Sequence, residues 1–204
     1  MSAPNKFDSL AAGWEGNSVH LERTRAIAAE MRRRFPLSKG WKALELGAGT
    51  GLLSVALCGE LGSVDAVDLS RGMIEVLGEK VRSLEILNVR PICQDLSQGD
   101  LPPERYDLAF SQMALHHIPD TSGILSRLHD LLFPGGRLAI ADLDREDGSF
   151  HGPEEQVHHG FDRQALLDLA RAAGFGELAI ETVFVISRDG REYPVFLLTG
   201  RSEG

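Results

Sequence analysis

The chain has 204 residues, which is enough for one α/β domain with a substantial core, and we expect a single domain over residues 1–204. Its formal net charge of -9 argues against a nucleic-acid partner, because binding to phosphates requires a surplus of lysine and arginine. No apolar run approaches the ~20 residues of a membrane span and no signal-peptide core is present, so we expect a cytoplasmic protein.

The first part of the chain is expected to be helical. Apolar residues recur at helical spacing over residues 17–35, and Pro36 ends this helix. Residues 1–36 are therefore expected to form a helical lid segment ahead of a sheet core over residues 40–204. Trp14 lies in this segment, where it belongs either to the core or to a lid that excludes water from a bound ligand.

Strands and helices then alternate along the chain. Strands are predicted over residues 42–46, 63–68, 89–93, 106–111 and 137–143. Helices are predicted over residues 52–61, after Ser70, and from Asp120 or Thr121 to residue 132, where Pro134, Gly135 and Gly136 break the pattern. This alternation predicts an α/β fold with a mostly parallel sheet that is covered by helices on both faces.

The end of the chain follows a different pattern. A helix over residues 162–173 is followed by strands over residues 178–186 and 193–199, with no helix between them. Residues 189–190 read Asp-Gly, which is a strong signal for a hairpin between these strands. We therefore expect the last two strands to be antiparallel, and Pro194 places the start of the last strand at an edge or a bulge.

A glycine-rich segment joins the first predicted strand to the helix that follows it. Residues 45–51 read Glu-Leu-Gly-Ala-Gly-Thr-Gly. Glycines at the carboxyl end of a strand allow a tight turn and a close approach of the backbone to a ligand. Their spacing is G-x-G-x-G, which differs from the G-x-G-x-x-G of dinucleotide sites. Glu45 also argues against an NAD-linked dehydrogenase, because a pyrophosphate binds to N–H groups rather than beside a carboxylate.

Two acidic residues follow the next two strands. Asp68 ends the second strand, a position suited to hydrogen bonding with ribose hydroxyls. Asp95 follows the third strand, where its side chain could accept a hydrogen bond from an adenine amino group. S-adenosylmethionine (SAM) carries an ammonium and a sulfonium but no phosphate, so Glu45 favours SAM over a dinucleotide.

With these motifs the chain resembles the class I SAM-dependent methyltransferases. The likeness is to the small-molecule group that includes the ubiquinone and menaquinone biosynthesis C-methyltransferases. It rests on residues 45–51, 67–70, 93–96, 106–118 and 132–138. The resemblance implies a Rossmann-like seven-stranded sheet, mostly parallel, with an antiparallel C-terminal strand.

The resemblance also implies the function and the cofactor-binding residues. The protein is expected to transfer a methyl group from SAM to an unidentified small molecule by in-line displacement, leaving S-adenosylhomocysteine (SAH). The alternative is a SAM-binding regulatory or assembly subunit without catalysis, and a monomer or a homodimer is expected in either case. The cofactor-binding residues would be Glu45, Gly47, Ala48, Gly49, Gly51, Asp68, Leu69, Met73, Gln94, Asp95, Leu96, Ser111 and Gln112.

Histidines are the candidate bases if the acceptor must lose a proton, because histidine titrates near neutral pH. The candidates are His116 and His117 after the fourth strand, and His151, His158 and His159 in the loop after the fifth strand. His116 and His159 are favoured for this role, although no catalytic residue is assigned. His117 and His158 are expected at the substrate or the lid, together with Trp14. A structural role is the alternative for each histidine taken singly.

The remaining acids and the cysteines are expected to have no ligand. Asp142, Asp144, Glu146 and Asp147 follow the fifth strand, where we expect a solvated acidic loop and no metal site. The two cysteines, residues 58 and 93, lack the spacing of metal ligands and are expected to be buried free thiols.

Overall fold

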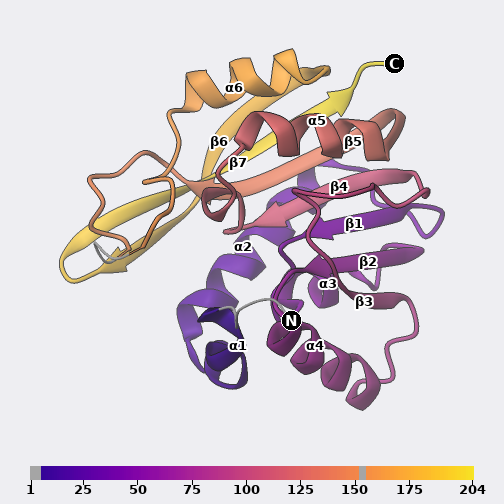
Figure 1. Cartoon of the computed structure of the whole chain (residues 1–204), viewed down its shortest axis with the longest axis horizontal. Helices are drawn as coiled ribbons and strands as arrows, with labels where there is room; N and C mark the ends of the chain where they lie inside the picture. The colour runs from indigo at the N-terminus through magenta and orange to yellow at the C-terminus, as the bar shows by residue number, and fades with distance from the viewer. Residues whose placement is uncertain (1–5, 152–154) are drawn as a thin grey trace.

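The computed structural model describes residues 6–151 and 155–204, and its centre is a seven-stranded sheet (Figure 1). The strand order is β3-β2-β1-β4-β5-β7-β6. The strands are β1 (Lys42–Leu46), β2 (Ser63–Asp68), β3 (Val89–Cys93), β4 (Tyr106–Gln112), β5 (Leu132–Leu143), β6 (Phe175–Arg188) and β7 (Arg191–Ser202). Strands β1 to β5 pair in parallel, whereas β7 runs antiparallel between β5 and β6. This arrangement confirms the predicted Rossmann-like sheet with an antiparallel C-terminal strand.

Helices cover both faces of the sheet, as the alternating pattern predicted. The helices are α1 (Lys6–Leu10), α2 (Ser18–Arg34), α3 (Leu52–Leu57), α4 (Arg71–Ser83), α5 (Thr121–Leu131) and α6 (Arg163–Ala172), with 3-10 turns η1 (Ala11–Gly16) and η2 (Leu115–His117). Residues of α2, α3 and α4 form one apolar core cluster, and residues of α5 and α6 form the other. The central strands are buried almost along their whole length because both faces are covered.

Polar side chains begin most of the longer helices. The side chains of Asn17, Ser70, Asp120 and Asp162 accept hydrogen bonds from backbone N–H groups in the first turns of α2, α4, α5 and α6. Each such cap typically contributes ~1 kcal/mol to helix stability. The cap at Ser70 matters for the site, because it sets where α4 starts after β2.

The N-terminal segment packs on the start of α4, to the lower left in Figure 1. A carboxylate oxygen of Asp8 accepts hydrogen bonds from Ser70 Oγ at 2.6 Å and from Gly72 N at 3.0 Å. A negative charge is favourable at this position, because helix N-termini carry positive partial charge. Lys80 of α4 completes the attachment through an ion pair with Glu15 of η1. Residues 1–5 of the predicted lid segment lie outside the described residues, and the lid stays a prediction.

Several element boundaries differ from the sequence-based expectation. Strand β5 begins at Leu132, so the segment Pro134 to Gly136 lies within its bounds as a register irregularity opposite Tyr106 and Leu108. Helix α3 ends at Leu57, four residues before the predicted end. In β5, Pro134, Gly135 and Gly136 bend the pairing with β4 locally without ending the strand.

The placement of Pro194 confirms the second of the two predicted alternatives. Strand β7 is an interior strand, but it starts beside a bulge. A register shift does lie beside Pro194, between Thr182 and Phe184 of β6. Pairing with β5 ends at Leu143 opposite Val195, so the missing N–H of Pro194 falls just beyond the end of that ladder.

The cysteines are free, but only one of them is sheltered from solvent. Cys58 is partly buried and Cys93 is exposed. The prediction of two buried thiols is therefore wrong for Cys93, because this residue is the last one of β3, which lies at the edge of the sheet.

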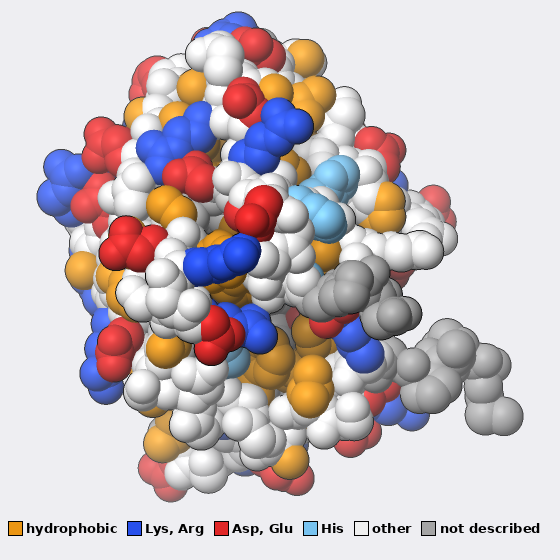
Figure 2. All heavy atoms as spheres, turned by 90° about the vertical axis from the view of Figure 1, so that its left-hand side faces the viewer, with side chains coloured by type: hydrophobic (Ala, Val, Ile, Leu, Met, Phe, Trp, Pro, Cys, Tyr) orange, Lys and Arg blue, Asp and Glu red, His pale blue; other side chains and the backbone are white. Residues whose placement is uncertain are grey.

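No helix within the described ranges is long and apolar enough to span a bilayer. On the face drawn in Figure 2, lysine and arginine side chains are interspersed with aspartate and glutamate.

Candidate functional site

A cavity of about 290 Å³ opens where β1, β2 and β4 end, on the carboxyl side of the parallel strands. Its walls come from four chain segments that follow successive strands: residues 46–49, 67–69, 94–98 and 112–114. In open α/β sheets this edge is where ligands bind. We call this space the first cavity.

The backbone of the glycine-rich loop is strained in a way that requires glycine. Gly47, Gly49 and Gly51 have φ angles of 66°, 54° and 76°, in the left-handed region that other residues rarely adopt. A Cβ atom at Gly47 would lie 2.2 Å from the Cβ of Ala114, and one at Gly51 would lie 2.2 Å from Cδ1 of Leu77. Two of the three glycines are thus needed for packing even without a ligand.

Asp68 ties this loop to the end of β2. One of its carboxylate oxygens accepts a hydrogen bond from Gly49 N at 2.8 Å, and the other accepts one from Ser70 N at 2.8 Å. Burial raises the pKa of Asp68, whereas these N–H groups act in the opposite direction. The side chain lines the first cavity, so its remaining lone pairs face a ligand.

Glu45 and Ser111 lie behind the wall of the cavity rather than on it. Glu45 is fully buried, and its Oε2 accepts hydrogen bonds from the backbone N–H of Ser54 at 3.0 Å and from the Ser54 hydroxyl. Its Oε1 has no partner among the residues that the structure describes. Burial raises the pKa of Glu45 to about 8. The hydroxyl of Ser111 donates to Leu46 O at 2.8 Å and holds β4 to β1.

The far end of the first cavity has the polarity expected for an adenine site. Leu69 is 58% exposed and Leu96 only 2%, and both side chains line the cavity. Asp95 accepts hydrogen bonds from the backbone N–H and hydroxyl of Ser97, at 2.8 and 2.6 Å, which fixes its carboxylate beside these two leucines. Apolar faces with one fixed acceptor suit a flat base with an amino group.

Most of the predicted cofactor residues share this cavity. Its lining includes Gly47, Ala48, Gly49, Asp68, Leu69, Met73, Gln94, Asp95, Leu96 and Gln112. Glu45, Gly51 and Ser111 do not line it. Gln112 is held by two hydrogen bonds with the Thr24 hydroxyl, at 3.1 and 3.0 Å, so helix α2 closes one side of the site.

A second cavity of about 200 Å³ adjoins the first. The two cavities have five lining residues in common: Phe7, Trp14, Arg23, Met113 and His117. Trp14 belongs to neither apolar core cluster, and its ring contacts those of Phe7 and His20, with centroids 6.0 and 4.7 Å away. Trp14 therefore stands where the N-terminal segment meets both cavities, and its role as a lid stays a prediction.

His116 lines the second cavity and forms a buried pair with Asp142, which lies behind the cavity wall. Nδ1 of His116 lies 2.6 Å from Oδ1 of Asp142, and the two side chains are 2% and 0% exposed. Burial alone would raise the pKa of Asp142, but the charge of His116 and the hydrogen bonds from His116 and Leu143 lower it. The expectation of a solvated acidic loop is wrong for Asp142, because it is still part of β5 and turns into the interior.

Two further imidazoles gather at this pair. His117 lines both cavities, and burial followed by the charge of His116 lowers its pKa to about 3. Burial and His116 also lower the pKa of His151. These rings are consequently neutral near pH 7. His151 was among the histidines expected in the loop after the fifth strand, but nothing in the sequence relates it to residues 116 and 117.

His158 and His159 lie outside both cavities. The ring of His158 is close to the carbonyl oxygens of Ile118 and Pro119, at 3.1 and 3.2 Å, and its backbone N–H donates to His116 O. His159 lines a separate hollow with Arg145 and Glu146. Of the two candidate bases, the structure therefore places His116 at the cavities and His159 away from them.

Arg23 is a site residue that the sequence analysis missed. It is 5% exposed, lines both cavities, and forms no hydrogen bond or ion pair with any described residue. Burial lowers the pKa of Arg23 to about 10, and the charge of Asp142 opposes this shift. A buried guanidinium without a partner is costly, which points to an anionic ligand. The signal in the sequence was a charged residue on the apolar face of α2, four positions before Ile27.

Comparison with known proteins agrees with this geometry. Residues 43–136 match the family model of a methyltransferase domain. The chain is 32% identical over 162 residues to an uncharacterized methyltransferase of Schizosaccharomyces pombe, covering 72% of this chain and 57% of that protein. By these matches the chain is similar to the class I SAM-dependent methyltransferases.

Other methyltransferases add detail to this assignment. A ubiquinone biosynthesis O-methyltransferase of Coxiella burnetii is 29% identical over 143 residues, which are 69% of this chain and 61% of that protein. The chain thus spans about three fifths of the length of these curated relatives.

Solved methyltransferase structures share the fold. Phosphoethanolamine N-methyltransferase 2 of Haemonchus contortus, in complex with SAM, superposes with a TM-score of 0.75 at 18% identity, covering 98% of this chain and 60% of that one. A SAM-dependent methyltransferase of Aquifex aeolicus has a TM-score of 0.68 at 20% identity, covering 97% and 99%.

Proposed function

We propose that this protein binds SAM in the first cavity and transfers its methyl group to a small molecule in the second, leaving SAH. The observation that carries the proposal is the wall that the two cavities share. Five residues line both cavities, so a methyl donor in one would lie beside an acceptor in the other. The SAM complex of the Haemonchus contortus enzyme, which has the same fold, supports SAM as the donor.

The first cavity provides a group for each part of SAM. The backbone of residues 47–49 would contact the methionine part, Asp68 the ribose hydroxyls, and Asp95 the adenine amino group. Arg23 would bind the carboxylate of the methionine part, which gives its buried guanidinium the anion that the described residues do not supply. Glu45 is buried behind the wall with a pKa raised to about 8, so it would not contact the ammonium directly.

The reaction would be an in-line displacement. A lone pair of the acceptor forms a bond to the methyl carbon as the bond from that carbon to the sulfonium breaks, and the electron pair stays on the sulfur of SAH. Holding the acceptor in line can supply up to about 7–11 kcal/mol of the barrier reduction. Trp14 and Phe7 of the N-terminal segment would exclude water from this contact.

The acceptor is proposed only as a small molecule. The sequence resembles C-methyltransferases, whereas the ubiquinone-pathway relative is by its name an O-methyltransferase. His117 lies at the junction, but burial lowers its pKa to about 3, which makes it a weak base, so no general base is assigned. Cytoplasmic location, the absence of a nucleic-acid partner, and a monomeric or homodimeric state stay predictions.

Two measurements test the proposal. Isothermal titration should show SAM and SAH binding to the wild-type protein, and Asp68→Ala should weaken it by at least about tenfold through the lost charged hydrogen bonds. A control is Asp147→Ala, which changes an exposed acid distant from the first cavity. Absence of SAM binding, or equal affinity in Asp68→Ala, would refute the cofactor assignment.

The second measurement separates an enzyme from a binding subunit. Tritiated SAM is incubated with the protein and a metabolite extract, and labelled small molecules are counted. We expect the wild type to transfer more tritium label to small molecules than Asp68→Ala does. Tight SAM binding without transfer would favour the regulatory or assembly subunit instead.

A further inference from the structure

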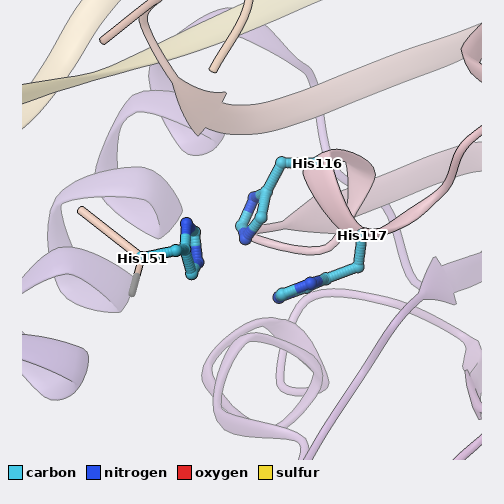
Figure 3. Close-up of side chains that lie close together, drawn as sticks. All are labelled: His116, His117 and His151. Atoms are coloured by element: carbon cyan, nitrogen blue, oxygen red, sulfur yellow. The ribbon is translucent and has the colours of Figure 1, made fainter. Parts of the chain in front are cut away.

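We propose that His116, His117 and His151 bind a divalent transition-metal ion, such as zinc, with one open position facing the second cavity. The three rings come from η2 and from the segment after β5, and they point toward one another (Figure 3). Their ligand nitrogens all lie within 4.8 Å of one another, and all three side chains line the second cavity.

The cluster is close to the size of a zinc site. Ring centroids are separated by 4.1 Å for His116 and His117, 4.8 Å for His116 and His151, and 5.5 Å for His117 and His151. Zinc–nitrogen bonds of about 2.0–2.1 Å in a tetrahedral site place two nitrogens about 3.3–3.4 Å apart. Metal binding therefore requires the widest pair to close by about 1.4 Å, which small rotations of half-buried side chains can provide.

The hydrogen bonds around the cluster leave metal-binding nitrogens free. In the neutral tautomer that carries its proton on Nδ1, His116 donates a hydrogen bond to Asp142 and keeps a lone pair on Nε2. A carboxylate bonded to the distal nitrogen of a ligating histidine is a recurring feature of zinc sites. Nδ1 of His151 is buried without a partner in the described part of the chain, and no hydrogen bond of the His117 ring is found there.

Three carboxylates and two cations face the cluster. Two cations, Lys6 and Arg23, and the carboxylate Glu155 line the same cavity, and Lys6 is paired with Glu155 at 2.5 Å. The carboxylates of Asp142 and Glu146 also act on the histidines. This surplus of carboxylates offsets part of the charge of a divalent ion. Imidazole ligands suit zinc, copper, iron, cobalt and nickel rather than magnesium or calcium.

Three protein ligands with an open fourth position are typical of catalytic rather than structural zinc. The chemistry that such an ion would perform rests on the proposed function. The ion would take an acceptor hydroxyl or thiol as its fourth ligand and lower its pKa, and the proton would pass to solvent. The metal-bound oxygen or sulfur would then form the bond to the methyl carbon while the sulfonium bond breaks, with its electron pair remaining on sulfur.

The experiment measures metal binding directly, in the full chain without a polyhistidine tag. The protein is treated with a chelator, dialysed, and titrated with Co²⁺ while the visible absorption of the ion is followed. Zn²⁺ affinity is then obtained by competition with a chromophoric chelator. The proposal expects one ion per chain, with the intense visible bands of four-coordinate Co²⁺ and displacement of Co²⁺ by Zn²⁺.

Variants decide whether the three histidines are the ligands. His117→Ala and His151→Ala should each weaken Zn²⁺ binding by at least about 100-fold, and Asp142→Asn, which removes a positioning residue, by about 10–100-fold. His159→Ala is the matched control, because that ring lies in a separate hollow, and it should bind Zn²⁺ like the wild type. Circular dichroism shows whether each variant is folded. If His117→Ala does not fold, His151→Ala alone tests the ligand assignment, because His151 is the less buried of the two residues.

The outcomes separate this proposal from the proposed function. Asp68→Ala should lose SAM binding and keep the Co²⁺ spectrum, whereas His151→Ala should keep SAM binding and lose the spectrum. Failure of wild-type protein to bind Zn²⁺ more tightly than His151→Ala would overturn the metal site and leave the SAM site untouched. Equal Zn²⁺ affinity in all variants would also overturn the metal site.

Discussion

Nδ1 of His116 lies 2.6 Å from Oδ1 of Asp142, and this contact joins the ends of two neighbouring strands. Asp142 lies in β5, and His116 lies in η2, just after β4. The same carboxylate accepts hydrogen bonds from the backbone N–H groups of His116 at 3.2 Å and Leu143 at 2.7 Å. One buried side chain therefore fixes both the histidine ring and the turn that carries it.

Removal of the Asp142 carboxylate should destabilise the fold. Asp142→Ala leaves the His116 ring and two buried N–H groups without their acceptor, so we expect a loss of about 3–5 kcal/mol in unfolding free energy. Urea unfolding followed by circular dichroism measures this. Asp147→Ala, which removes an exposed acid five residues later, should leave the midpoint unchanged. Equal midpoints for the two variants would show that the buried pair contributes nothing to stability.

Arg23 leads to a prediction in which binding and stability change in opposite directions. Arg23→Met should weaken SAM binding by about 10–150-fold, because a charged hydrogen bond contributes about 1.5–3 kcal/mol. It should leave the free protein at least as stable, because a buried cation without a partner is removed. Isothermal titration and urea unfolding measure the two effects.

Decarboxylated SAM makes the test of Arg23 specific. The wild type should bind this compound more weakly than SAM, and Arg23→Met should bind both alike. Arg25→Met, at an exposed position of the same helix, is the control and should behave as the wild type. If Arg23→Met still binds SAM more tightly than decarboxylated SAM, another group of the protein binds the carboxylate of SAM.

The sheet and the cofactor loop could be predicted because their signals are local. The apolar runs of β1 and β4, the cap at Ser70 and the Asp189-Gly190 turn each act within a few residues, and each is found in the structure. Glycines with left-handed φ angles likewise mark the loop from Gly47 to Gly51. Such features need no knowledge of what packs against them.

The second cavity could not be predicted, because it depends on contacts between distant segments. His116 and Asp142 are 26 positions apart and meet because β4 and β5 are paired in register. Arg23 lines both cavities because α2 packs beside them, which the sequence of α2 alone does not reveal. Glu45 shows the converse: its motif suggested a ligand contact, but its side chain is buried and one of its oxygens is bound by Ser54 at the start of α3.

The strain in the glycine loop gives a third prediction. Gly51→Ala combines a φ of 76° with a Cβ position 2.2 Å from Leu77, so we expect a loss of about 2–4 kcal/mol in unfolding free energy. Gly99→Ala separates the two causes, because Gly99 has a φ of 69° but no atom within 4 Å of the added Cβ. It should lose only about 1 kcal/mol. Equal losses in the two variants would contradict the packing argument for Gly51.

The buried carboxyl group of Glu45 should make stability depend on pH. Burial raises its pKa from 4.5 to about 8 in the folded protein, so the folded state holds a proton that the unfolded state releases between these values. Unfolding free energy should therefore fall as the pH rises from 5 to 8, by about 3–5 kcal/mol from this group.

Glu45→Gln tests this dependence, because glutamine can accept the same hydrogen bonds from Ser54 but does not titrate. The quantity to compare is the difference in unfolding free energy between wild type and Glu45→Gln, from urea titrations at several pH values. Other titrating groups are common to both proteins, so their contributions cancel in the difference. The wild type should lose stability relative to the variant as the pH rises. Parallel curves would mean that Glu45 is ionised in the folded protein throughout this range, with Lys80 or another cation close enough to outweigh the cost of burial.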